Sequence, residues 1–182
     1  HVTTFTSASG SVSAADGGAF MVLEGDGPDA TGPFTRFDGY RSDFVDGLET
    51  GVKVYLDTGW TTGQGFEYSV AANDGAGNHQ RDFVFSIVKD DSGQLLVHAS
   101  NNAADSATLP DLGGIGTAVP ASGWYTLEHV FGDGGSGHLS VTLNLIDQDG
   151  DVVYTQPLSD AGDTIPGEAG GKKFDGVMTN VQ

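Results

Sequence analysis

The segment HLSVTLNLID, residues 138–147, alternates apolar and polar side chains from His138 to Leu145. Successive side chains of a β-strand point to opposite faces of the sheet, so this pattern predicts a strand that buries one face. The apolar face carries Leu139, Val141, Leu143 and Leu145, and the polar face carries Ser140, Thr142 and Asn144. An Asp-Gly pair follows at residues 149–150 and favours a tight turn, so we expect a hairpin over residues 147–154.

The same alternation recurs along the chain, whereas no apolar stripe at helical spacing persists. It predicts further strands at residues 19–24, 51–57, 65–72, 81–89, 94–100 and 124–131. So many short strands in 182 residues predict an all-β chain, folded as a single domain over residues 1–182. We expect two antiparallel sheets packed as a β-sandwich of jelly-roll type, with a closed barrel as the alternative. The longest irregular stretch, residues 101–122, is expected to be a surface loop.

The charge balance restricts the partners of the chain. It has 25 acidic and 7 basic residues, a formal net charge of -18, so nucleic acid or an anionic membrane surface would be repelled. No apolar run approaches the roughly 20 residues of a membrane-spanning helix, and we expect no membrane insertion. Cysteine is absent, which excludes disulfides. Abundant Gly, Ser, Thr, Asp and Asn with few Lys favour a secreted or cell-surface protein, with a cytosolic one as the alternative.

The acidic loop LEGDGPDATG, residues 23–32, is a candidate calcium site. Calcium takes about 6 to 8 oxygen ligands, which a flexible loop rich in Gly and Asp provides at short range. The expected ligands are Glu24, Asp26 and Asp29, with Asp175 completing the site from near the other end of the chain. We therefore expect structural calcium as a cofactor. The alternative is that these carboxylates are only solvated turn residues.

The loop NDGAGNHQ, residues 73–80, joins two predicted strands and is rich in polar side chains. Planar amides, carboxylates and guanidinium groups bind sugar hydroxyls as paired donors and acceptors, and an aromatic ring commonly packs under the sugar. The polar candidates are Asn78, His79 and Arg81, and the aromatic candidates are Trp60, Tyr68 and Trp124. The structural alternative is that Arg81 pairs with a nearby acid and that Trp124 is a core residue.

An enzyme is a second interpretation of the same strands. Alternation places Glu67 and Glu128 on the polar faces of their strands, and two carboxylates on facing strands are what glycoside hydrolysis needs. These two glutamates stand alone, without the clustered acidic motif that is typical of glucanases. A polysaccharide lyase would instead use Arg81, His98 and Tyr68 as charge neutraliser and base. On so acidic a chain, an anionic polysaccharide is a poor electrostatic match unless calcium bridges it.

About half of the chain resembles bacterial domains of the concanavalin A-like lectin/glucanase superfamily, which includes laminin G-like jelly rolls. The resemblance lies in VYLD from residue 54, GQGFEYSVAANDGAGNHQRDFVFSIVKD at 63–90, LLVHASNNA from 95 and GWYTLEHVFGDGG from 123. It implies two curved antiparallel sheets, a calcium ion near the edge, and a ligand site on the concave face or rim loops. We therefore expect a calcium-stabilised carbohydrate-binding or adhesive module within a larger surface or secreted protein. The alternative is a polysaccharide-degrading enzyme of the same fold.

Overall fold

The computed structural model describes residues 2–24, 34–36, 47–73, 79–101, 112, 114–135, 137–164 and 174–179. These residues form β-strands and turns, with no helix among them, and hence no helix of the length and apolarity that crossing a membrane requires. The strands are β1 (Val2–Thr6), β2 (Ala8–Ser9), β3 (Val12–Ser13), β4 (Phe20–Glu24), β5 (Phe34–Arg36), β6 (Leu48–Leu56), β7 (Gly65–Asn73), β8 (His79–Lys89), β9 (Leu95–Ser100), β10 (Thr117–Ala118), β11 (Gly123–Asp133), β12 (His138–Ile146), β13 (Val152–Thr164) and β14 (Phe174–Thr179).

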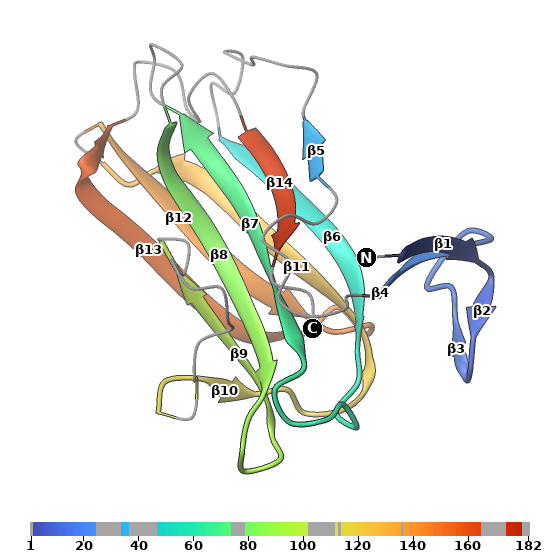
Figure 1. Ribbon diagram of the computed structural model, residues 1–182. Helices are drawn as coiled ribbons and strands as arrows, with labels where there is room; N and C mark the ends of the chain where they lie inside the picture. Colours follow the sequence, from blue (N-terminus) through green and yellow to red (C-terminus); the bar gives the residue numbers. More distant parts are fainter. Residues whose placement is uncertain are drawn as a thin grey trace.

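Two antiparallel sheets make up the body of the molecule (Figure 1). The six-stranded sheet has the order β10-β9-β8-β7-β14-β5 and is called the large sheet below. The four-stranded sheet has the order β13-β12-β11-β6 and is called the small sheet. The predicted all-β, antiparallel two-sheet architecture is confirmed, and each predicted strand has its counterpart. The jelly-roll connectivity stays a prediction.

The core lies between the two sheets, as the alternation predicts. Strand β12 is the clearest case, because its burial alternates at every residue and Leu139, Val141, Leu143 and Leu145 are each 3% exposed or less. The large sheet faces them with a second set of buried side chains, which includes Phe66, Tyr68, Val70, Phe83, Phe85, Ile87 and Val97. Together they form one cluster that spans both sheets, so the two sheets are stabilised by a shared apolar interior.

The segment expected as a surface loop, residues 101–122, is partly packed against the large sheet. Its strand β10 pairs with β9, and Leu112 is fully buried against Val88 and Leu96. A Cβ at Gly116 would lie 2.8 Å from Cβ of Leu96, so this loop approaches the sheet at a point where only glycine fits. This part of the segment therefore covers one face of the large sheet and is not a free loop.

Residues 2–24 form an arm beside the sandwich. Within it β1 pairs with β4 and β2 pairs with β3, and Figure 1 shows both pairs at one side of the two main sheets. The sequence predicted a strand over residues 19–24 but not that it would leave the sandwich. The arm contacts the small sheet through Trp124 of β11, which packs against Phe20 and donates to the backbone oxygen of Ser13.

One buried polar residue lies at the centre of the core. His129 is 0% exposed, and its ring lies 5.6, 5.1 and 6.2 Å from the rings of Tyr68, Phe85 and Phe131. Its Nε2 is 3.0 Å from the backbone oxygen of Phe83, so Nε2 carries the proton and donates it. Its Nδ1 has no hydrogen-bond partner within the described part of the chain. Burial lowers the pKa of His129 to about 4, which keeps the imidazole neutral at neutral pH.

Acidification is expected to destabilise the fold through His129. In the unfolded chain its pKa is about 6.5, so the unfolded state takes up the proton first as the pH falls. This group alone should lower the free energy of unfolding by about 3 kcal/mol between pH 7 and pH 4. Urea denaturation across this range should show a smaller decrease for His129→Leu than for the unmodified chain. Identical pH profiles for the two proteins would show that His129 is not the source of the destabilisation.

Candidate functional site

The outer faces of the two sheets differ in their exposure to solvent. On the large sheet the middle of the outer face is covered, and each of the following is 6% exposed or less: Glu67, Ser69, Val84, Ser86 and Val88. Other outward side chains of this sheet, Ala71, Asp82, His98 and Ser100, are half-buried. On the small sheet the outward side chains are half-buried or exposed. We call this second surface the open face; it is formed by β6, β11, β12 and β13 and includes Lys53, Thr126, Glu128, Asn144, Ile146 and Thr155. The outer face of the small sheet is therefore the more accessible of the two.

A row of hydrogen-bonded polar side chains crosses the open face. Glu128, Asn144 and Thr155 stand directly opposite one another on β11, β12 and β13. Asn144 Nδ2 donates to Glu128 Oε2 at 2.8 Å, and Thr155 Oγ1 donates to Asn144 Oδ1 at 2.7 Å. On β6 the row continues with Gly51, which has no side chain to cover the carboxylate. This polar ladder (Glu128, Asn144 and Thr155) holds donors and acceptors in fixed positions at the surface.

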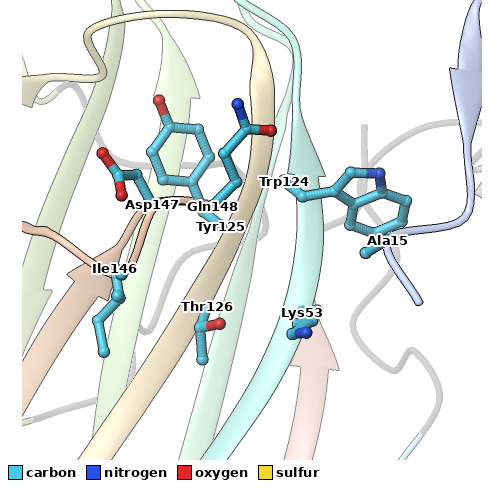
Figure 2. Close-up of a pocket in the computed structure, with 9 residues that line it drawn as sticks. Ala15, Lys53, Trp124, Tyr125, Thr126, Ile146, Asp147 and Gln148 are labelled. Atoms are coloured by element: carbon cyan, nitrogen blue, oxygen red, sulfur yellow. The ribbon is translucent and has the colours of Figure 1, made fainter.

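A pocket of about 320 Å³ adjoins the polar ladder on the same face. Its floor is the neighbouring row of the sheet, where Lys53, Thr126 and Ile146 lie side by side. Figure 2 shows this row together with Gln148, from the turn after β12, and Ala15 from the arm. The pocket is therefore bounded by the sheet, by one of its turns and by the arm. We call it the arm pocket.

Trp124, a predicted stacking residue, lines the arm pocket and also holds the arm. Its indole N–H donates to the backbone oxygen of Ser13 at 2.8 Å. Its ring lies 5.5 Å from the ring of Phe20 and 5.7 Å from that of Tyr55, both edge to face. Trp124 thus joins the arm to the small sheet and lies outside the core cluster between the two sheets.

The other two predicted aromatic residues belong to the interior. Tyr68 is 8% exposed in the core, and burial raises its pKa to about 12. Trp60 packs against the core cluster with its ring 6.2 Å from that of Phe66. Neither ring lies on the open face, so the sequence grouped three aromatic residues that the structure separates.

Arg81 is engaged in an ion pair between the two sheets. From β8 its Nε donates to both carboxylate oxygens of Asp163 on β13, at 3.1 and 3.0 Å, and its Nη2 donates to one of them at 2.8 Å. Asp160 lies 3.6 Å away. The hydrogen bonds with Asp163 raise the pKa of Arg81, against the opposing effect of partial burial. The structural alternative for Arg81 thus has direct support, although its partner lies on the opposite sheet.

Several predicted site residues lie outside the described residues or side chains. Asn78, Asp26 and Asp29 are outside the described residues, and only the backbones of His79, Glu24 and Asp175 are described. Where side chains are described, no group of three or more His, Asp or Glu is placed to hold a metal ion. The predicted calcium site and the amide-rich end of the 73–80 loop therefore stay predictions.

The two glutamates of the enzyme interpretation point away from each other. Glu67 lies on the covered outer face of the large sheet, where Ser86 Oγ donates to it at 3.0 Å. Glu128 lies on the open face of the small sheet, so the whole sandwich separates the two carboxylates. The lyase residues also diverge: Tyr68 is in the core, whereas His98, opposite Ser86, is on the outer side of the large sheet. Neither acid–base arrangement is assembled.

Sequence reasoning missed the main residues of the open face. Alternation placed Asn144 and Glu128 on polar faces, but nothing in the pattern indicated that the two side chains meet. Lys53, Thr155 and Gln148 were not singled out at all. Polar residues occur at matching positions of three consecutive strands, Glu128, Asn144 and Thr155. That they lie opposite one another can be deduced only once the pairing of the strands is known.

Breaking the ion pair between the sheets is expected to destabilise the fold. Arg81→Ala leaves the Asp163 carboxylate, 3% exposed, without its partner and should lower the free energy of unfolding by about 3 kcal/mol. The double variant with Asp163→Ala should lose less than the sum of the single changes, as measured by chemical denaturation. Lys53→Ala, which breaks the exposed ion pair with Asp16, is the control and should change stability by less than about 1 kcal/mol. Additive effects of Arg81→Ala and Asp163→Ala would contradict the coupling.

Comparison of the chain with protein-family models, with curated proteins and with solved structures finds no match. A fold of this class supports many functions, so the chemistry of the open face, and not the fold, decides what this chain binds.

Proposed function

We propose that the chain is a carbohydrate-binding module and that it binds a neutral glycan on the open face of the small sheet. The observation that carries the proposal is the polar ladder, a fixed row of carboxylate, amide and hydroxyl groups at the surface. The arm pocket adjoins it with Trp124 in its wall. This combination of polar and apolar surface is what sugar recognition uses.

The polar ladder matches the hydrogen-bonding needs of sugar hydroxyls. Each hydroxyl both donates and accepts, so it is bound best by groups of both kinds held at fixed spacing. The Glu128 carboxylate accepts, and the amide of Asn144 and the hydroxyl of Thr155 supply donors and acceptors. Because these side chains already hold one another in place, less conformational entropy is lost when a ligand binds.

Charge favours a neutral glycan over an acidic one. The whole chain carries a formal charge of -18, and Glu128 and Asp147 contribute negative charge at the site itself. Lys53, the positive residue among the pocket-lining side chains, is paired with Asp16 of the arm. A carboxylated or sulfated polysaccharide would therefore be repelled unless a cation bridged it.

The wider proposal includes calcium, the location of the protein and its context. We infer a structural calcium ion held by Glu24, Asp26, Asp29 and Asp175, in a secreted or cell-surface protein that carries other domains and takes part in adhesion. The acidic composition and the resemblance to concanavalin A-like domains support this inference. A glycan-degrading activity is not favoured, because Glu67 and Glu128 do not face each other.

Asn144→Ala removes both hydrogen bonds of the polar ladder and is expected to weaken binding of a neutral glycan at least tenfold, or about 1.4 kcal/mol. The measurement is a screen of immobilised neutral glucans, xylans, mannans and galactans, followed by titration calorimetry on the strongest ligand. Thr155→Val should weaken binding by a smaller factor, because it removes one donor and keeps the shape of the side chain.

Thr117→Val is the matched control for Thr155→Val. Thr117 is exposed on β10, at the edge of the large sheet, and its replacement should leave affinity unchanged. Equal affinities for the unmodified chain, Asn144→Ala and Thr155→Val would show that the glycan does not bind at the polar ladder. If the chain bound no glycan on the screen, the proposed carbohydrate-binding function would be wrong.

Calcium is expected to stabilise the folded chain. At a concentration 100 times its dissociation constant, an ion that binds only the native state adds about 2.7 kcal/mol to the free energy of unfolding. Thermal denaturation with calcium and with a chelator should therefore differ, and Asp26→Asn combined with Asp29→Asn should abolish the difference. Identical melting temperatures in calcium and chelator would eliminate the calcium site.

A further inference from the structure

The arm crosses the open face at one end of the small sheet. Trp124 binds the backbone of Ser13 and packs against Phe20, and Lys53 pairs with Asp16. These contacts fix residues 13–20 over the end of the sheet where β6 and β11 carry Tyr55 and Trp124. The open face therefore has one end closed by the arm.

The arm pocket lies at this closed end. Ala15 of the arm lines it on one side, and Asp147, Gln148 and Gly150 of the turn after β12 line it on another. The turn is held rigidly, because Asp147 Oδ1 accepts hydrogen bonds from the backbone N–H groups of Asp149 at 3.0 Å and Asp151 at 2.9 Å. A ligand that lies along the face toward this end therefore meets the arm over β6 and β11 and the turn after β12.

The size of the arm pocket and its distance from the polar ladder suit the terminal residue of a glycan. Its volume of about 320 Å³ is at the lower limit of ligand pockets, which span about 300 to 1,000 Å³. Its floor row, with Thr126, and the row with Glu128 are two residues apart on β11, or about 7 Å. One ligand can therefore occupy the pocket and reach the polar ladder.

The chemistry of the arm pocket is that of a sugar subsite. The Thr126 hydroxyl and the Gln148 amide have no hydrogen-bond partner within the described residues, and both line the pocket. The ring of Trp124 and the side chain of Ile146 provide apolar surface in the same wall and floor. Hydroxyl-binding groups beside an apolar surface are the combination that a pyranose ring requires.

We propose that the arm pocket binds the terminal residue of a neutral glycan, while the following residues lie along the polar ladder. The protein thus recognises chain ends and not internal stretches of a polysaccharide. This inference rests on the proposed function and deepens it, because it names the part of the glycan that is bound. It also makes the arm a part of the binding site.

The test uses the unmodified chain and a neutral linear polysaccharide taken from the screen of glucans, xylans, mannans and galactans. Partial hydrolysis of the polymer raises the number of chain ends at constant sugar mass. Titration calorimetry should find binding sites in proportion to chain ends. Binding that scales with sugar mass, and stays constant as the number of ends increases, would overturn the inference. The proposed function would stay intact if Asn144→Ala still weakens this binding at least tenfold.

Two variants test whether the arm contributes to glycan binding. Ala15→Phe fills the pocket from the arm side and is expected to weaken binding of short oligosaccharides at least tenfold, whereas Ser11→Phe, at the exposed tip of the arm, should leave it unchanged. Tryptophan fluorescence reports whether the arm still packs on Trp124 in each variant. Unchanged affinity in Ala15→Phe would overturn the inference. If the unmodified chain bound none of the neutral glycans, both the inference and the proposed function would be wrong.

Discussion

The unequal covering of the two sheets is the constraint on which the rest of the structure depends. A two-sheet sandwich buries the inner faces of both sheets, and its outer faces need cover only if they are apolar. The large sheet carries Val84 and Val88 on its outer side, and both are buried there. The small sheet carries Thr126, Glu128, Asn144 and Thr155 on its outer side together with Ile146 and Val130, and all of these are half-buried or exposed. The outer face of the large sheet is thus largely used for packing, and the outer face of the small sheet is more accessible to a ligand.

Trp124 connects this constraint to the proposed function. A tryptophan on a polar sheet face would expose a large apolar area, and here the arm covers part of it through Ser13 and Phe20. The resulting contact has two effects. It attaches a segment that is separate from the main sheets, and it closes one end of the open face. The sequence predicted that Trp124 either stacks on a ligand or lies in the core. In the structure it packs against the arm and lines the arm pocket, and it lies outside the core.

The strands and their inward faces could be predicted from the sequence because alternation is a local signal. The meeting of distant segments could not. Arg81 and Asp163 are 82 positions apart, and Trp124 and Ser13 are 111 apart, so no local pattern relates them. Leu112, which covers Val88 and Leu96 on the large sheet, belongs to an irregular stretch of sequence without periodicity. Residue type alone therefore identified polar candidates such as Glu128 and Asn144 without showing which face they share or whether it is exposed.

The most direct test of the central claim is the location of ligand contacts by NMR. Backbone amide shifts of the isotope-labelled chain would be followed during titration with the strongest neutral oligosaccharide from the screen. We expect the perturbed amides to lie on β6, β11, β12 and β13 and around Ala15 of the arm, with the large sheet unaffected. Perturbations confined to β7, β8 and the 73–80 loop, or an absence of perturbation on the small sheet, would contradict the account.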